Sequence, residues 1–81
     1  MIIGIDIGGT TTDIAGFRSG EIVGPITVRA DDPLASAAGA LGKFIEVNRS
    51  TLSQVEVIAA TGVGSMGLKD ELFGIPIIKI D

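Results

Sequence analysis

Two periods of apolar residues alternate along the chain, one typical of strands and the other of a helix. Short apolar runs rich in β-branched residues, each bounded by glycine or turn residues, predict five strands over residues 2–7, 11–17, 22–28, 55–60 and 75–80. Tight turns at Gly8-Gly9 and at Arg18-Ser19-Gly20-Glu21 join the first three, which predicts an antiparallel meander. Gly24-Pro25 interrupts the third strand, and a proline without an N–H suits an edge strand or a bulge.

The helical period appears between the third and fourth strands. Asp31-Asp32-Pro33 is typical of a helix start, with an acidic cap before a proline in the first turn. Apolar residues then recur every three or four positions through Asn48 and form one apolar face: Leu34, Ala37, Ala38, Leu41, Phe44 and Ile45. Gly39 and Gly42 weaken this helix, so we expect them to serve close packing against the sheet. A second, shorter helix is expected over residues 65–72.

The order of these elements predicts the sheet. Because β-α-β crossovers are right-handed, the fourth and fifth strands should lie parallel to the first, on the side away from the meander. The result is an α/β fold with a mixed five-stranded sheet of order 3-2-1-4-5, strand 2 antiparallel, and two helices. This arrangement resembles a ribonuclease-H-like half-domain, as in actin-like ATPases. We therefore expect residues 1–81 to be the N-terminal part of a larger domain.

Charge and composition narrow the classes of function. The net charge is −4, and six cations spread along the chain form no basic stripe, which argues against nucleic acid as a partner. Cysteine and histidine are absent, so these residues contain no disulfide, thiol nucleophile or histidine-based site. The first residues do not resemble a signal peptide, and no apolar run approaches the roughly 20 residues that span a bilayer. We expect a cytoplasmic protein with no membrane partner.

The turn after the first strand carries the most informative chemistry. Asp6 lies at the carboxyl end of that strand, where ligands of open α/β sheets bind. Gly8 and Gly9 permit positive φ and a close approach of the backbone to a ligand. Three threonines follow, and we expect them to supply hydroxyls and N–H groups for cofactor binding: Thr10, Thr11 and Thr12. Converging amides in such a turn form an anion nest that suits nucleotide phosphates, and Asp6 is placed to hold Mg²⁺ through water.

The alternative is an ordinary Gly-Gly hairpin with a solubilising acid. The acid two residues before the glycines and the run of threonines after them favour the phosphate loop. It is not a Walker loop, since it lacks Gly-Lys-Ser/Thr, and it is not a dinucleotide fingerprint, since the turn leads into a strand.

Two segments resemble a known family. GIDIGGTTTDI is similar to the first phosphate motif of the actin/hexokinase/acetate-kinase superfamily, and VIAATGVGSMGLKDELFGIPIIKID resembles a segment of type II pantothenate kinases. The resemblance implies an ATP-dependent kinase that phosphorylates pantothenate in coenzyme A synthesis. It implies that five residues surround the β- and γ-phosphates of ATP and its Mg²⁺: Asp6, Gly8, Gly9, Thr10 and Thr11. The family's general base, a glutamate, is expected directly after Asp81, so no catalytic residue is expected within this chain and the chain alone should be inactive.

One departure from that family keeps other classes open. Many members carry a lysine where Asp13 stands, and the GGTTTD pattern also occurs in hydantoinase/oxoprolinase-type ATPases. An activator of a 2-hydroxyacyl-CoA dehydratase would share the fold but needs cysteines for an iron–sulfur cluster. A regulator of the actin-like or sugar-sensing type, which binds nucleotide without turnover, is a third possibility.

A second glycine loop follows the fourth strand, and its members are Thr61, Gly62, Val63 and Gly64. The loop should lie beside the first, either as a tight turn or as a wall of the substrate cleft formed by Thr61, Gly62 and Gly64. We expect Met66 and Phe73 to pack in the interior. One sheet face and the strand at 75–78 should lack cover, so a dimer through that face or edge is expected.

Overall fold

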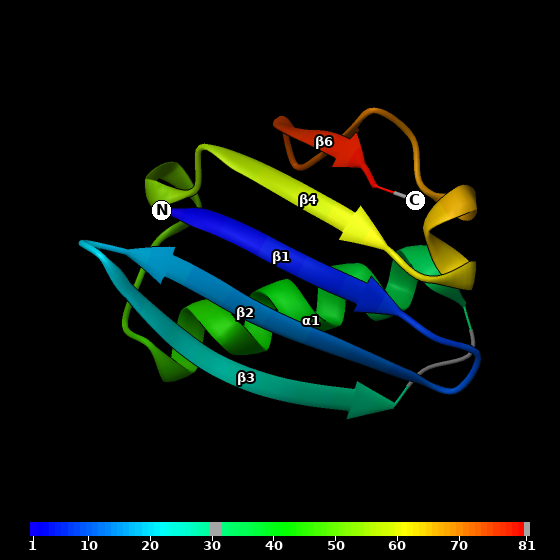
Figure 1. Ribbon diagram of the computed structural model, residues 1–81, viewed down its shortest axis with the longest axis horizontal. Helices are drawn as coiled ribbons and strands as arrows, with labels where there is room; N and C mark the ends of the chain where they lie inside the picture. Colours follow the sequence, from blue (N-terminus) through cyan, green and yellow to red (C-terminus); the bar gives the residue numbers. More distant parts are fainter. Residues whose placement is uncertain (30–31, 81) are drawn as a thin grey trace.

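A computed structural model describes residues 1–29 and 32–80 of the chain. It contains one mixed sheet in the order β3-β2-β1-β4-β6-β5, which confirms the predicted arrangement and adds one short strand at its edge (Figure 1). The strands are β1 (Ile2–Ile7), β2 (Thr11–Arg18), β3 (Glu21–Arg29), β4 (Val57–Thr61), β5 (Glu71–Leu72) and β6 (Ile75–Lys79). β2 runs antiparallel to β1, whereas β4 runs parallel to both β1 and β6.

The predicted edge strand and its bulge are both present. β3 pairs only with β2 in the described sheet, and the register between them shifts opposite Ile14 to Gly16. Pro25 lies in the shifted stretch of this strand and has no register partner on β2, so its missing N–H breaks no paired position. The turn before it is a two-residue hairpin in which Ser19 and Gly20 both have positive φ, as a type I′ turn requires.

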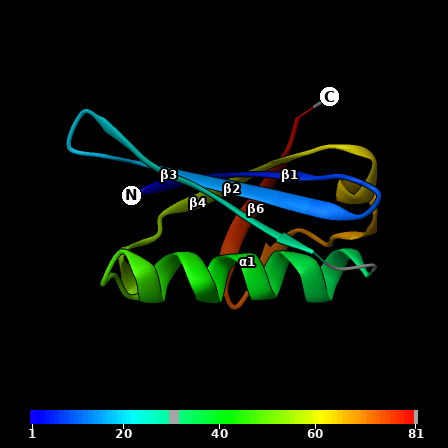
Figure 2. The same ribbon diagram turned by 90° about the horizontal axis from the view of Figure 1, so that it is seen from below.

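One α-helix, α1 (Pro33–Val47), covers one face of the sheet (Figure 2). It begins as predicted, because the side chain of Asp32 accepts a hydrogen bond from the Ala35 N–H at 2.8 Å and Pro33 occupies the first turn. The expectation for its glycines was wrong. Gly39 and Gly42 are exposed, and a Cβ added to either would meet nothing within 4 Å.

The core lies between this helix and the sheet. Ile3, Ile5 and Ile7 of β1 project toward α1 and are at most 2% exposed, which follows from strand alternation. Phe44 is the largest fully buried side chain of this layer, and Gly16 of β2 lies directly against its ring. Neither this helix nor the short 3-10 turns are long and apolar enough to cross a membrane, within residues 1–29 and 32–80.

The helix expected over residues 65–72 is not formed. Instead a short 3-10 turn, η2 (Val63–Gly67), is held by i to i+3 hydrogen bonds from Ser65 N to Gly62 O and from Leu68 N to Ser65 O. Glycines at both of its ends disfavour a longer helix. The chain then extends into β5 and returns to β6 through Phe73-Gly74, where both φ values are positive.

The exposure of two side chains also corrects the sequence interpretation. Met66 is 79% exposed and Phe73 is 62% exposed, so neither packs in the interior. Met66 lies in the 3-10 turn η2, and Phe73 occupies the tip of the β5–β6 hairpin. Their apolar character therefore belongs to the surface of the described fold.

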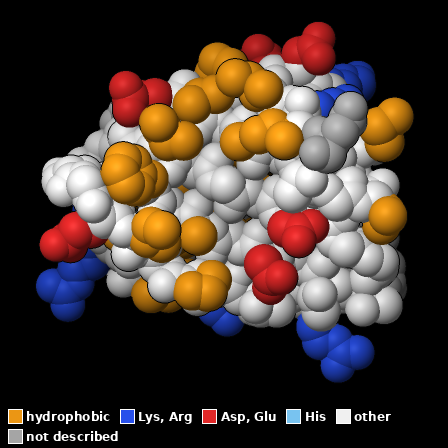
Figure 3. Space-filling model, viewed as in Figure 1, with side chains coloured by type: hydrophobic (Ala, Val, Ile, Leu, Met, Phe, Trp, Pro, Cys, Tyr) orange, Lys and Arg blue, Asp and Glu red, His pale blue; other side chains and the backbone are white. Residues whose placement is uncertain are grey.

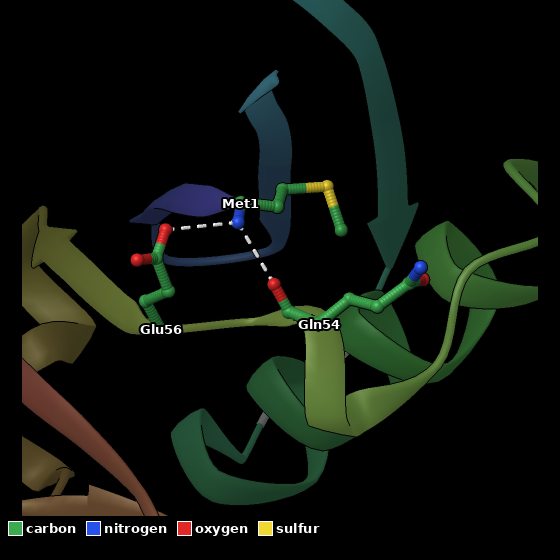
Figure 4. A network of polar contacts seen from close by, with 3 residues as sticks. All are labelled: Met1, Gln54 and Glu56. Carbon is green, nitrogen blue, oxygen red and sulfur yellow. Dashed lines mark hydrogen bonds and ion pairs between the residues drawn. The ribbon is translucent and has the colours of Figure 1, made fainter. Parts of the chain in front are cut away.

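A polar clamp holds the start of β1 against the segment that precedes β4 (Figure 4). The Met1 ammonium donates to the Gln54 carbonyl at 2.8 Å and lies 3.0 Å from Glu56 Oε2. The Met1 carbonyl in turn accepts from the Glu56 N–H at 2.9 Å. A second 3-10 turn, η1 (Leu52–Gln54), delivers this segment to the clamp. These contacts lie where the parallel register of β1 and β4 begins.

The sheet face opposite α1 has no helix over it in the described part of the chain (Figure 2). Cross-strand register arranges its side chains in three rows. The apolar row contains Ile22, Phe17 and Ile2. The row of small residues contains Ala15, Gly4 and Ala59. The polar row contains Thr27, Asp13, Asp6 and Thr61. Figure 3 views this face and shows hydrophobic side chains gathered over its left half, acidic side chains right of its centre, and further acidic side chains around the edge.

Candidate functional site

The β1–β2 connection is a tight loop of three residues, Gly8, Gly9 and Thr10, at the carboxyl end of β1. The Gly8 N–H donates to the Thr11 carbonyl at 2.8 Å and closes the hairpin. A Cβ on Gly8 would lie 3.1 Å from that same carbonyl oxygen, which explains glycine at this position. Neither glycine has a positive φ. The freedom for left-handed backbone expected from the sequence at these two glycines is therefore not used.

Two backbone N–H groups of this loop are not used within the described part of the chain. Gly9 and Thr10 are exposed, and their N–H groups have no hydrogen-bond partner among residues 1–29 and 32–80. The Gly8 N–H is already used by the hairpin, so the donors without a described partner begin one residue after the start of the predicted nest. Thr11 is exposed as well, and its hydroxyl lies on the same side of β2 as Asp13.

Thr12 lies elsewhere. Its side chain is 1% exposed and points toward α1, where its hydroxyl shares a hydrogen bond with that of Ser36. Its hydroxyl therefore does not reach the open side of the loop, contrary to the expectation that all three threonines present hydroxyls there. Strand alternation explains the difference, since Thr12 and Ile14 share the face that packs on the helix.

Asp6 and Asp13 are cross-strand neighbours on the open face. The Thr27 hydroxyl donates to Asp13 Oδ1, whereas the Asp6 carboxylate accepts no hydrogen bond in the part of the chain that the structure describes. Like charges directly opposite each other destabilise a sheet, so this pair would gain from a cation. No group of three acidic side chains that could hold a metal occurs among the described residues, so water or phosphate oxygens would have to complete a Mg²⁺ shell.

The second glycine loop lies beside the first, as predicted. Thr61 is the register partner of Asp6 in the parallel pair of β1 and β4. A Cβ on Gly62 would lie 2.8 Å from the Ile7 nitrogen and closer still to Asp6 Oδ1 and the Ile7 oxygen. A Cβ on Gly64 would collide with the Ile7 side chain. Both glycines are therefore required by close contact with the end of β1.

Two hollows flank Thr61. One has a volume of about 370 Å³ and includes Asp6, Asp13, Ala59 and Ile80 in its lining. The other, of about 390 Å³, is lined by Gly62, Val63, Ser65 and Met66 together with Thr61 and Ile80. The Asp6 carboxylate thus borders an open space on the sheet face, at the end of the molecule where the β1–β2 loop, η2 and the end of β4 gather (Figure 1).

Sequence reasoning missed two polar residues near the loop. Thr27 holds Asp13, and its signal was its position opposite Asp13 in a predicted hairpin. Ser65 is 6% exposed and donates its hydroxyl to the Gly62 carbonyl at 2.8 Å. The expected general base lies beyond Asp81, and Asp81 itself is outside the described residues.

Comparison with known proteins gives a fold. No protein-family model matches the chain, and no curated protein matches it either. Among solved structures, it is similar to the "Activator of the 2-Hydroxyisocaproyl-CoA Dehydratase from Clostridium difficile with bound ADPNP", with a TM-score of 0.75 and 22% sequence identity. The similarity covers 96% of this chain and 28% of the activator chain.

At this identity the similarity shows the fold alone, an α/β fold with a mixed sheet that the chain shares with part of this activator. The fold class expected from the sequence is confirmed, with one α-helix and two 3-10 turns in place of two helices. The chain spans only 28% of the length of that activator chain.

Proposed function

We propose that the β1–β2 loop binds the phosphates of ATP and that Asp6 holds the accompanying Mg²⁺ through water. The observation that carries this proposal is a loop at the carboxyl end of β1, shortly after Asp6, in which Gly9 and Thr10 are exposed and their N–H groups donate to no described residue. Outward amides in a tight turn bind anions, and Mg²⁺ prefers carboxylate and phosphate oxygens while keeping part of its water shell. The activator with this fold was solved with bound ADPNP, which supports the proposal.

The charges of the site predict how ATP binds. The loop itself contains no cation, and Asp6 and Asp13 would both repel a free triphosphate. Binding should therefore depend strongly on Mg²⁺, which neutralises charge on both sides. A single loop leaves most of the nucleotide in water, so we expect an affinity no tighter than about millimolar for this chain.

The test is the affinity of the chain for ADPNP, measured by NMR titration with Mg²⁺ and again with EDTA. We expect Mg²⁺ to tighten binding about tenfold, and Asp6→Asn to abolish that gain, because a charge-assisted contact contributes about 1.5 kcal/mol. Glu46→Gln is the matched control, since it removes one exposed carboxylate near the far end of α1. Equal affinity with and without Mg²⁺ would exclude the proposed role of Asp6.

For the reaction of the intact protein we propose transfer of the γ-phosphoryl group of ATP to pantothenate. The support is the resemblance of residues 57–81 to the type II pantothenate kinases. In phosphoryl transfer the protein mainly positions the phosphates and stabilises their charge, and the phosphate loop would contribute part of that.

A second candidate is ATP hydrolysis by an activator-type or hydantoinase-type ATPase. The similarity to a dehydratase activator favours it, as does Asp13 in place of a lysine. Incubating the intact protein with ATP and pantothenate separates the two. Phosphorylated pantothenate identifies the kinase, whereas phosphate release that ignores pantothenate identifies the ATPase.

We also propose that two copies of the chain associate through the open sheet face. Five large apolar side chains on that face are 45–76% exposed: Ile2, Phe17, Ile22, Ile78 and Ile80. At roughly 200 Å² for a fully exposed large side chain, two such faces would bury on the order of 1,000 Å², the lower bound of a stable interface. The expected open edge at residues 75–78 is partly closed, because β5 pairs with Ile75 and Pro76. Light scattering that finds only monomer at high concentration would contradict the dimer.

A further inference from the structure

We infer that Gly62 is a positioning residue, whose missing side chain sets the orientation of the Asp6 carboxylate for Mg²⁺. This inference rests on the proposed role of Asp6 in the nucleotide site. It assigns the second glycine loop a task in metal binding, in place of the expected choice between a plain turn and a wall of the substrate cleft.

The backbone at Gly62 is unusual. Its φ of 91° and ψ of 166° lie in a region that is essentially restricted to glycine. Ser65 holds this conformation from the other side, because its N–H and its hydroxyl both donate to the Gly62 carbonyl, at 3.0 and 2.8 Å. Ser65 is nearly buried, so the loop is a fixed element of the fold.

This fixed backbone lies against the Asp6 side chain. The space where a Cβ would stand at Gly62 is bounded by Asp6 Oδ1 and by the backbone of Ile7. Pairing with both β2 and β4 holds the β1 backbone in place. A side chain added at Gly62 would displace the Asp6 carboxylate and would also press on the Ile7 backbone, so its effect on folding has to be measured as well.

The other neighbours of Asp6 cannot supply that constraint. Its carboxylate accepts no hydrogen bond from any described residue, and Asp13 opposite it carries the same charge. Among the described residues, Gly62 is therefore the neighbour that limits the orientation of the Asp6 side chain. A carboxylate in a fixed orientation can hold a Mg²⁺ water shell beside the phosphate loop, because Mg²⁺ demands near-ideal octahedral geometry.

Two other glycines provide matched controls. Gly74 has a similar positive φ of 80° in the β5–β6 turn, but a Cβ there would meet nothing within 4 Å. Gly74→Ala therefore places a side chain on a residue of positive φ without touching Asp6. Gly64→Ala instead collides with the Ile7 side chain, so it reports damage to packing near the same strand end.

The experiment compares ADPNP affinity with Mg²⁺ and with EDTA for the wild type, Gly62→Ala, Gly74→Ala and Gly64→Ala, each checked for folding by thermal melting. In the wild type, Mg²⁺ should raise the ADPNP affinity about tenfold. We expect Gly62→Ala to lose this gain in affinity while keeping the affinity measured with EDTA. Gly74→Ala should keep the gain and the affinity with EDTA. In the Asp6→Asn background, Gly62→Ala should have no further effect on the Mg²⁺ gain, because both changes remove the same interaction.

Each outcome decides a separate point. A folded Gly62→Ala variant with the full Mg²⁺ gain, or with a gain no lower than that of Gly64→Ala, overturns the positioning role and leaves the nucleotide proposal standing. A wild type without any Mg²⁺ gain overturns both. Should Gly62→Ala fail to fold, Ser65→Ala keeps the glycine and removes the hydroxyl bond to its carbonyl, while the backbone N–H bond remains. We then expect a partial loss of the Mg²⁺ gain, and an unchanged gain contradicts the inference.

Discussion

Removal of the Thr12 hydroxyl tests whether this threonine belongs to the core or to the nucleotide site. Thr12 and Ser36 are each 1% exposed, and their hydroxyls bond to each other between β2 and α1. Every buried side-chain polar atom in the described part of the chain has a partner. Thr12→Val keeps a side chain of similar size but leaves the Ser36 hydroxyl without its partner.

The size of the effect follows from what Ser36 can do next. A buried hydroxyl without a partner costs about 1–3 kcal/mol. A serine within a helix can turn toward the carbonyl four residues earlier, which here belongs to Asp32 and already accepts from the Ser36 N–H. We therefore expect a loss of about 1–2 kcal/mol and a fall in Tm of roughly 5–10 °C.

The assay is a double-mutant cycle by thermal or urea unfolding. Ser36→Ala alone should cost a similar amount, because it leaves the Thr12 hydroxyl without a partner. The double variant should be as stable as the wild type or more so, since both polar groups are gone and alanine favours the helix by about 0.5 kcal/mol. Strictly additive losses, or a drop in ADPNP affinity of folded Thr12→Val, would refute this account of Thr12.

Three further predictions address the helix, the core and the site. Gly39→Ala and Gly42→Ala should each stabilise the chain by about 1 kcal/mol, because both positions are helical and open; a lower Tm would contradict that reading. Gly16→Ala should cost about 1–3 kcal/mol in urea unfolding, because its Cβ would lie 2.7 Å from the phenylalanine ring beneath it, and a neutral result would mean that the core is looser than described. Asp13→Lys should raise the affinity for metal-free ADPNP roughly tenfold by placing a cation beside the phosphates, whereas Glu46→Lys, the same charge change near the far end of α1, should not; equal effects would point to net charge alone.

The regular parts of the fold could be read from the sequence because their signals are local. Alternation and turn residues define β1 to β3, and Asp32 with Pro33 marks the start of α1. The right-handed crossover rule then places β4 beside β1, which brings the two glycine loops together. Proximity of Asp6 and Gly62 follows from topology and needs no long-range signal.

The errors arose at residues whose burial or conformation depends on their surroundings in the folded chain. The periodic pattern showed which helix face is apolar, but it could not show that Gly39 and Gly42 lie outside the contact. The 65–72 segment has enough apolar residues for a helix, yet its glycines and the Phe73-Gly74 hairpin favour a 3-10 turn and a strand. Thr12 was within reach of sequence reasoning, since alternation with Ile14 already placed it on the buried face.

The most direct measurement of the central claim is a ¹H–¹⁵N NMR titration of the uniformly labelled chain with Mg²⁺ and ADPNP. The account predicts that the largest chemical-shift changes occur at the Gly9 and Thr10 amides, followed by the amides around Asp6 and Gly62. The amide shifts at the far end of α1 should not change. Shifts scattered over the open apolar face, with those two amides unmoved at saturating nucleotide, would contradict it.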